Sequence, residues 1–210
     1  MSCRVAVLVS GEGSNLQAIL DTLHGREGIE VVCVAASRAG ARALERAERA
    51  GVPTRVFAAA DHPDRVARDE ALGEWVGSHG VDLVVLAGFM ELLSPAFIRR
   101  FEGRIVNVHP SLLPAFPGLC AIEQAIRYGV KVTGVTVHFV DEGVDSGPII
   151  LQEVLALPYP RPIEAIAESL HEIEHRLLPR AIRLIARGAV RIDPSDARLV
   201  TIEEADDAGD

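Results

Sequence analysis

The chain alternates short apolar runs with longer segments in which apolar residues recur at helical spacing. The apolar runs, which we expect to form strands, are Arg4–Val9, Val31–Ala36, Pro53–Phe57, Asp82–Leu86, Arg104–His109, Val132–Val140, Ile149–Leu157 and Ala189–Ile192. The segments that we expect to be helical are Leu16–Leu23, Ala41–Ala50, His62–His79, the stretch that begins at Ser94-Pro95, Ala121–Tyr128 and Ile163–Arg187. Apolar strands separated by helices are typical of a parallel sheet that is covered on both faces. The sequence therefore predicts a single α/β domain with a doubly wound, mostly parallel, Rossmann-like sheet.

The length of the chain indicates one domain, and its charge argues against a nucleic-acid partner. The 210 residues suit one domain, which we expect to span residues 1–192 and to be followed by a polar, acidic tail over residues 193–210. The formal net charge is −9, and the last eight residues, E-E-A-D-D-A-G-D, supply five carboxylates and no cation. The rest of the chain is mildly acidic, whereas a nucleic-acid surface is expected to be basic. We therefore expect small-molecule substrates and no nucleic-acid partner.

The cysteines and the early apolar run indicate where in the cell the protein is located. Cys3, Cys33 and Cys120 are few, odd in number and widely spaced, which favours a reducing compartment over a disulfide framework or a thiolate metal site. The early apolar run Val5–Val9 is too short for a signal peptide or a membrane span. We expect a cytoplasmic protein with no membrane partner, either a monomer or a homodimer.

A glycine-rich loop, S-G-E-G-S-N over residues 10–15, lies between the first predicted strand and the first predicted helix. Backbone N–H groups and the helix dipole can hold an anion at such a place. A dinucleotide site would need a third glycine where Leu16 stands and an acidic residue where Ser37-Arg38 follow the second strand. The lysine of a nucleoside-triphosphate loop is absent as well. The loop indicates a site for a phosphate monoester, and the alternative is a tight structural turn.

Asn107 and His109 are two residues apart on a predicted strand, so their side chains point to the same face. Pro110 ends that strand, and ligands of open α/β sheets bind at carboxyl ends of strands. An amide that stabilises an oxyanion beside an imidazole that moves a proton suits acyl transfer. Asp145 lies in an acidic turn and by itself is equally compatible with a simple Asx turn. No histidine or cysteine cluster has metal-ligand spacing, so we expect no metal.

Four long segments together resemble the formyltransferase family that uses 10-formyltetrahydrofolate. They are S-G-E-G-S-N-L-Q-A-I (10–19), V-L-A-G-F-M-E-L-L-S-P-A-F (85–97), N-V-H-P-S-L-L-P-A-F-P-G (107–118) and V-T-V-H-F-V-D-E-G-V-D-S-G-P-I-I (135–150). Their order and spacing match the family, and the resemblance covers roughly Arg4 to Arg191.

The resemblance implies a role for individual residues. The catalytic residues that it implies are Asn107, His109 and Asp145. The residues that it implies for a ribonucleotide substrate are Gly11, Glu12, Gly13, Ser14, Asn15 and Glu174. Those that it implies for the folate are Arg65, Met90, Glu91, Leu92, Leu93 and Asn107. The chain departs from the family at Cys120, where a histidine or acidic residue is usual, and at Ile122, a position that is often polar. We expect Cys120 to line the substrate cleft.

The activity implied by the resemblance is transfer of a formyl group from 10-formyltetrahydrofolate to the amine of 5-phosphoribosylglycinamide, in the synthesis of purines (IMP). In that reaction the amine attacks directly, Asn107 and His109 stabilise the oxyanion, and Asp145 assists the proton transfer. Three alternatives stay open: a formyltetrahydrofolate deformylase, a formyltransferase acting on methionyl-tRNA, and a non-enzymatic module that binds a phosphate ligand. The tRNA enzyme would need a basic RNA-binding domain, which the acidic C-terminal residues do not suggest.

Overall fold

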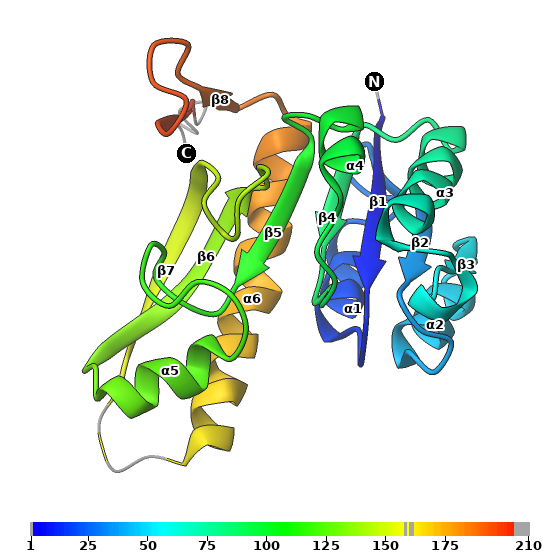
Figure 1. The fold of residues 1–210 in the computed structure, drawn as a ribbon. Coiled ribbons are helices and arrows are strands. Elements are labelled where there is room, and N and C mark those ends of the chain that lie inside the picture. The colour runs from blue at the N-terminus through cyan, green and yellow to red at the C-terminus, as the bar shows by residue number, and fades with distance from the viewer. Residues whose placement is uncertain (1, 158, 160–161, 204–210) are drawn as a thin grey trace.

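The computed structural model describes residues 2–157, 159 and 162–203, and a seven-stranded sheet forms its centre (Figure 1). The strands of this sheet are β1 (Cys3–Val9), β2 (Ile29–Ala36), β3 (Thr54–Val56), β4 (Leu83–Leu86), β5 (Ile105–His109), β6 (Val132–Phe139) and β7 (Ile149–Ala156). The α-helices are α1 (Ser14–Thr22), α2 (Arg42–Arg49), α3 (Arg65–Ser78), α4 (Pro95–Arg100), α5 (Ala121–Tyr128) and α6 (Ile163–Ala186). A short 3-10 helix, η1, covers Ala59–Asp61. The spatial order of the strands is β3-β2-β1-β4-β5-β6-β7.

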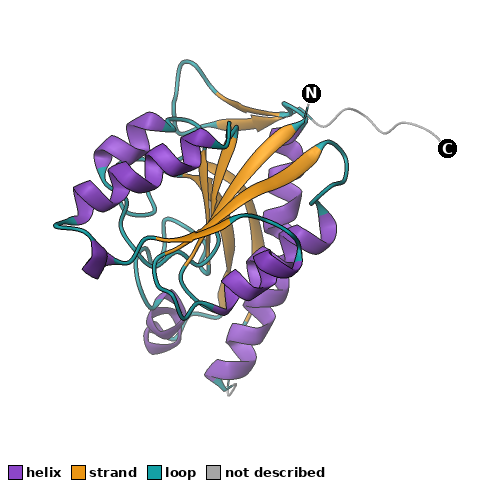
Figure 2. Cartoon of the chain, turned by 90° about the vertical axis from the view of Figure 1, so that its right-hand side faces the viewer, coloured by secondary structure: helices purple, strands orange, loops and turns teal. Residues whose placement is uncertain are grey.

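Apolar side chains of the sheet point to both faces, which is why helices cover both. In β1 the valines Val5, Val7 and Val9 pack in a cluster with side chains of α1, α2 and α6. Ala6 and Leu8 alternate with them and pack in a second cluster with side chains of α3 and α4. Figure 2 shows helices on either side of the strands. The predicted doubly wound α/β fold is confirmed.

Strand direction changes in the second half of the sheet. The neighbours β3-β2-β1-β4-β5 run parallel, whereas β6 is antiparallel to both β5 and β7. The connection from β6 to β7, residues 140–148, is too short for the crossover that parallel neighbours require. Direct pairing of Asn107 with His138 follows from the β5–β6 register.

The strand order brings four loops to one edge of the sheet. The strand order extends from β1 to β2 and β3 on one side and to β4 and β5 on the other, so the carboxyl end of β1 is a topological switch point. Open α/β sheets bind ligands at such a point. The carboxyl ends of β1, β2, β4 and β5 carry, respectively, residues 10–13, Ser37-Arg38, residues 87–94 and residues 110–120. The loop between β6 and β7 starts at the other end of β5 and folds back toward this edge, because its Asp145 contacts Asn107.

Local sequence determines where two of the helices begin. Asp64 accepts a hydrogen bond from the N–H of Ala67 and starts α3, while Ser94 accepts one from Phe97 and precedes Pro95 in α4. Helix α3 therefore begins at Arg65, three residues later than the predicted start at His62.

A second, two-stranded sheet pairs β8 (Val190–Ile192) with β9 (Val200–Ile202), so part of the segment 193–210 is an ordered strand. Of the acidic residues of that segment, Asp193, Asp196 and Glu203 are described, whereas Glu204, Asp206, Asp207 and Asp210 lie outside the described residues. Within the described ranges, no helix is both long enough and apolar enough to cross a membrane.

Candidate active site

Two cavities adjoin at the carboxyl ends of the strands. The first, the glycine-loop cavity, has a volume of about 570 Å³ and is lined by residues that include Gly11–Asn15, Arg38, His171 and Glu174. The second, the apolar cavity, has a volume of about 500 Å³ and is lined by residues that include Arg65, 89–93, Asn107, His109, 118–121 and Asp145. Both cavities include Gly88, Met90, Glu91, Val108 and Pro110 in their walls. Two ligands can therefore lie side by side, and Asn107 and His109 line the apolar cavity next to the shared residues Val108 and Pro110.

The glycine loop has its shape because Gly13 packs against α2. Its φ is +73°, and a Cβ there would lie 2.6 Å from the Cβ and 2.7 Å from the Cα of Ala43. Helix α1 begins at the next residue, and no side chain caps its first N–H groups. These N–H groups and the positive end of the helix dipole are available to an anion in the glycine-loop cavity.

Glu174 reaches this loop from the distant helix α6. Its Oε2 accepts a hydrogen bond of 2.8 Å from Nδ2 of Asn15, and both side chains are buried, with exposed fractions of 6% and 8%. Burial raises the pKa of Glu174, and the Asn15 hydrogen bond and nearby His171 only partly offset it. Oδ1 of Asn15 is buried without a hydrogen-bond partner among the described residues. The pair thus offers hydrogen-bonding capacity to a polar ligand in the cavity.

The apolar cavity has exposed apolar side chains on its wall. Met90, Leu92 and Leu119 are 66%, 59% and 71% exposed and lie on the same wall, and such a group of exposed apolar side chains suits an apolar ligand. Their loop is anchored by Arg68, which is only 2% exposed and donates to Oε2 of Glu91 at 3.0 Å and to the carbonyl of Leu92 at 3.3 Å. The same guanidinium pairs with Asp69, whose other oxygen accepts from the Ser94 N–H. Arg65, the first residue of α3, is exposed on the cavity wall.

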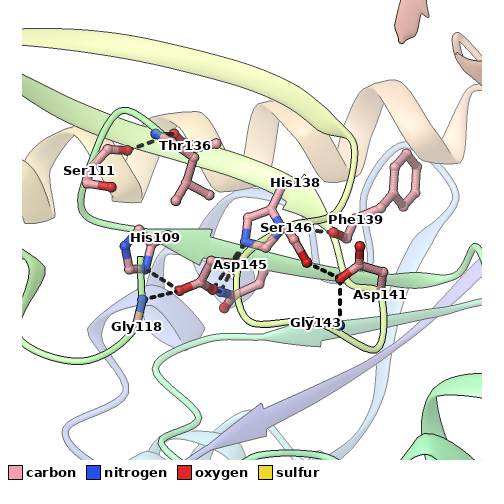
Figure 3. Close-up of polar contacts among 12 residues, drawn as sticks. His109, Ser111, Gly118, Thr136, His138, Phe139, Asp141, Gly143, Asp145 and Ser146 are labelled. Atoms are coloured by element: carbon pink, nitrogen blue, oxygen red, sulfur yellow. Dashed lines mark hydrogen bonds and ion pairs between the residues drawn. The ribbon is translucent and has the colours of Figure 1, made fainter. Parts of the chain in front are cut away.

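The carboxylate of Asp145 lies between two imidazoles (Figure 3). Oδ2 is 3.4 Å from Nδ1 of His109, and Oδ1 is 3.6 Å from Nε2 of His138. Oδ1 also accepts from Nδ2 of Asn107 at 3.3 Å, and Oδ2 accepts from the N–H of Gly118 at 2.7 Å. The structure therefore brings the three predicted catalytic side chains into one cluster, and it adds His138.

Hydrogen bonds to backbone carbonyls orient both imidazoles. Nε2 of His109 lies 2.8 Å from the carbonyl oxygen of Phe116, and Nδ1 of His138 lies 2.8 Å from that of Phe139. Carbonyl oxygens only accept, so these nitrogens carry protons and the other nitrogen of each ring faces Asp145. A proton on that second nitrogen can pass to and from the carboxylate.

The surroundings of Asp145 keep it ionised. Burial alone raises the pKa of this carboxyl, but the hydrogen bonds from His138 and the Gly118 N–H, with the charges of His109 and His138, outweigh it and hold the pKa below its usual range. Asp145 has a φ of +50°, a left-handed conformation that aspartate tolerates better than most residues. The site thus holds an anion within reach of a proton-carrying histidine.

Buried hydrogen bonds fix the loop that follows His109. The hydroxyl of Thr136 donates to the carbonyl of Ser111 at 2.7 Å and accepts from the N–H of Leu113 at 3.1 Å. Gln152 donates to the carbonyl of Leu113 at 2.9 Å. These contacts join the loop to β6 and β7 (Figure 3 shows the Ser111–Thr136 bond), so the Phe116 carbonyl and the Gly118 N–H are held beside the cluster.

All residues expected for the ribonucleotide line one cavity and all those expected for the folate line the other, with Met90 and Glu91 on the shared wall. Gly11, Glu12, Gly13, Ser14, Asn15 and Glu174 line the glycine-loop cavity, and Arg65, Met90, Glu91, Leu92, Leu93 and Asn107 line the apolar cavity. Cys120 lines the apolar cavity, as expected, and stands at the N-cap position of α5 with a φ of +59° and no capping hydrogen bond from its side chain.

Sequence reasoning did not assign His138, Arg38 or His171, which also line the two cavities. The signal for His138 was its position in V-T-V-H-F-V, but only the register opposite Asn107 shows its role. Among the described residues, no group of three or more His, Cys, Asp or Glu side chains is arranged to hold a metal ion.

Comparisons with known proteins agree with this geometry. Residues 3–182 match the sequence profile of the formyl transferase family. The phosphoribosylglycinamide formyltransferase of Mycobacterium tuberculosis is 44% identical over 90% of this chain and 87% of its own length. The trifunctional purine biosynthetic protein adenosine-3 of Bos taurus is 45% identical over 90% of this chain, which spans only 19% of that longer protein.

Solved structures show the same likeness. The structure of glycinamide ribonucleotide transformylase 1 from Symbiobacterium toebii superposes with a TM-score of 0.92 at 48% identity, covering 97% of this chain and 95% of that one. The phosphoribosylglycinamide formyltransferase of Anaplasma phagocytophilum superposes with a TM-score of 0.90 at 35% identity, over 99% of this chain and 97% of that one. The family profile, the full-length relatives and the fold agree, and this chain belongs to the formyl transferase family.

Proposed function

We propose that this enzyme transfers the formyl group of 10-formyltetrahydrofolate to the amine of 5-phosphoribosylglycinamide. The observation that carries the proposal is the meeting of two cavities beside one Asn–His–Asp cluster. A transferase needs room for a donor and an acceptor at the same catalytic groups. The names of the relatives, which include phosphoribosylglycinamide formyltransferases, support the same reaction.

The ribonucleotide would bind in the glycine-loop cavity. The N–H groups of residues 11–15 and the start of α1 suit its phosphate. The Asn15–Glu174 pair is buried at the other side of the loop, where its oxygens can accept hydrogen bonds from ribose hydroxyls. The amine would then extend past Val108 and Pro110, the shared part of the wall, toward His109.

The folate would bind in the apolar cavity. An aromatic ring system fits a wall with exposed Met90 and Leu92, and the guanidinium of Arg65 suits a carboxylate at the solvent side. When bound there, 10-formyltetrahydrofolate supplies an activated formyl carbon. The chemistry of the wall is compatible with this co-substrate, because it pairs apolar surface with few polar groups.

The reaction forms a bond between the amine nitrogen and the formyl carbon and breaks the bond from that carbon to the folate nitrogen. Nδ2 of Asn107 and a protonated His109 stabilise the oxyanion that develops on the formyl oxygen. Asp145, held anionic, accepts the proton that the amine loses, directly or through a water, and returns it to the departing folate nitrogen. The present contacts of 3.3 to 3.4 Å are long, as catalytic hydrogen bonds often are before substrate binds.

Hydrolysis of the same folate by an activated water is the main alternative. A deformylase would use the same cluster but would need no second organic substrate. The glycine-loop cavity, with its buried Asn15–Glu174 pair, favours transfer because hydrolysis leaves it without a ligand. A binding module without catalysis would leave the Asn107–His109–Asp145 cluster without a role.

The test is release of tetrahydrofolate from 10-formyltetrahydrofolate, followed by absorbance, with and without phosphoribosylglycinamide. We expect release that depends on the ribonucleotide and saturates with it. Equal release without the ribonucleotide would establish the hydrolase instead, and the Asp145→Asn variant controls for contaminating activity.

The proposal includes a cytoplasmic enzyme that acts as a monomer or a homodimer on small-molecule substrates. The support for this location is that Cys3, Cys33 and Cys120 are all unpaired thiols. Fluorescence microscopy of the tagged chain tests the location, and sedimentation at several protein concentrations tests the oligomeric state.

A further inference from the structure

The glycine-loop cavity has one arginine or lysine side chain, Arg38, among its described lining residues. Three carboxyl side chains line it, those of Glu12, Glu91 and Glu174, and among its described lining residues Arg38 is the one side chain that is always cationic. His171 is the one imidazole on this wall. Glu12 and Glu91 already pair with Arg42 and Arg68, so Arg38 is the lining cation that remains to compensate the charge of a phosphate dianion.

Arginines near the loop other than Arg38 are already paired. Arg42 forms an ion pair of 2.9 Å with Glu12, and Arg46 donates to the Glu12 carbonyl and to Gln17. Arg68 is buried against Asp69 and Glu91. Arg38 forms no ion pair with a described residue, so its charge is available to a ligand.

The backbone of the glycine loop holds the Arg38 side chain in place. Nε donates to the carbonyl of Ser10 at 2.5 Å, and the neighbouring Ser37 donates from its hydroxyl to that of Ser10 at 2.7 Å. Nη2 lies 3.6 Å from the point where a Cβ of Gly11 would be. Nη2 of the guanidinium therefore lies beside Gly11, and both residues line the cavity.

We propose that Arg38 binds the phosphate of the ribonucleotide and selects it over an unphosphorylated analogue; this inference rests on the function proposed above. Arg38 follows β2, the place at which dinucleotide-binding sheets carry an acidic residue for a ribose hydroxyl and an arginine accommodates an extra phosphate. A guanidinium forms two parallel hydrogen bonds to phosphate oxygens, which an ammonium cannot reproduce. Arg38 is thus a specificity-determining residue that complements the loop N–H groups.

The first arm of the test measures binding without turnover. Inorganic phosphate and ribose 5-phosphate are titrated into wild type, Arg38→Gln and Arg38→Lys by calorimetry. We expect affinity to fall about tenfold or more in Arg38→Gln and to be only partly restored in Arg38→Lys, because charge-assisted hydrogen bonds are lost. Arg49→Gln is the matched control, since Arg49 is exposed on α2 outside the cavity and changes the net charge equally.

The second arm measures steady-state kinetics with the ribonucleotide. Arg38→Gln is expected to raise KM for the ribonucleotide about tenfold while kcat and KM for the folate change by less than about threefold, because the contact is equal in ground and transition states. Raised salt is expected to weaken ribonucleotide binding in wild type more than in Arg38→Gln.

The two arms separate this inference from the proposed function. Unchanged phosphate and ribonucleotide affinity in Arg38→Gln, or an equal loss in Arg49→Gln, overturns the role of Arg38 even if the enzyme turns over normally. Arg38-dependent phosphate binding by a protein that does not formylate the ribonucleotide supports the phosphate site and refutes the reaction.

Discussion

Replacement of Asp145 by asparagine tests the proton path most sharply, because it removes one charge and keeps the shape of the side chain. The carboxylate lies 3.4 Å from His109 and 3.6 Å from His138, and its side chain is 14% exposed. Asparagine can still accept the hydrogen bond of 2.7 Å from the Gly118 N–H. The loop is therefore expected to keep its conformation while the proton acceptor is lost.

The expected magnitude follows from the role of the group. Loss of a positioned general acid–base lowers kcat by about 10²- to 10⁴-fold, and a 10²-fold loss corresponds to about 2.7 kcal/mol of activation free energy. KM for the ribonucleotide should change by less than about threefold, because Asp145 does not line the glycine-loop cavity. The free energy of unfolding should fall by about 1 kcal/mol, the difference between charged and neutral hydrogen-bond acceptors.

The pH dependence has a definite sign. The folded state holds the pKa of Asp145 below its usual range, so its contribution to stability is full above the unfolded pKa of about 3.9 and is lost as pH falls through the folded pKa. Wild type and Asp145→Asn should therefore differ in stability at neutral pH and converge in acid. Any acid limb of the kcat profile between about pH 5 and 8 then belongs to another group, since Asp145 is already ionised there.

The assay is steady-state formyl transfer from pH 5 to 9, with thermal unfolding of the same samples. Asp141→Asn is the matched control, because Asp141 lies in the same loop and its carboxylate accepts hydrogen bonds from Gly143 and Ser146 instead of contacting Asn107, His109 or His138. A kcat within about threefold of wild type in Asp145→Asn would refute the proton path. Equal losses in both variants would show that only the loop conformation matters.

Three further predictions concern the cavity walls. Gly13→Val is expected to lower Tm strongly, because its side chain collides with the backbone of Ala43, whereas Gly11→Ala should leave Tm nearly unchanged. Thermal melts followed by circular dichroism measure both values, and equal Tm values for the two variants would contradict the close packing of Gly13 against Ala43. Glu174→Gln should gain stability relative to wild type as pH rises above the usual carboxyl pKa, because burial raises the pKa of Glu174 and its ionisation destabilises the folded state. The Tm of both proteins is measured against pH, and a difference in Tm that does not change with pH would refute this prediction. Cys120→Ser should keep most of the activity, whereas a maleimide on the native thiol should block activity, and bound substrates should slow the labelling. Complete loss of activity in Cys120→Ser would show that the thiol has a chemical role.

The layered fold follows from local sequence, but the direction of the last strands does not. Val5, Val7 and Val9 alternate with Ala6 and Leu8, so β1 needs cover on both faces, and the pattern shows this without coordinates. The apolar run of β6 looks like those of the parallel strands, and a helix, α5, connects it to β5, as in a parallel unit. Its antiparallel pairing with β5 depends on tertiary contacts, whereas the short connection from β6 to β7 already excludes a crossover.

The catalytic cluster could be predicted only in part. Asn107 and His109 share a strand face at a spacing that indicates their role, whereas Asp145 reaches them through a loop that folds back along β5. His138 pairs with Asn107 only because of the β5–β6 register. Arg38 was visible as an unexpected residue after β2, but its contact with Ser10 depends on how β1 and β2 pair.

The fate of the formyl carbon distinguishes transfer to the ribonucleotide from hydrolysis. Wild-type enzyme is incubated with 10-formyltetrahydrofolate labelled with ¹³C in the formyl group and with phosphoribosylglycinamide, and ¹³C NMR follows the label. We expect the label to appear as the formamide carbon of the ribonucleotide, one equivalent for each tetrahydrofolate released, and Asp145→Asn to slow its appearance about 10²-fold or more. Label that appears as free formate at a rate independent of the ribonucleotide would contradict it.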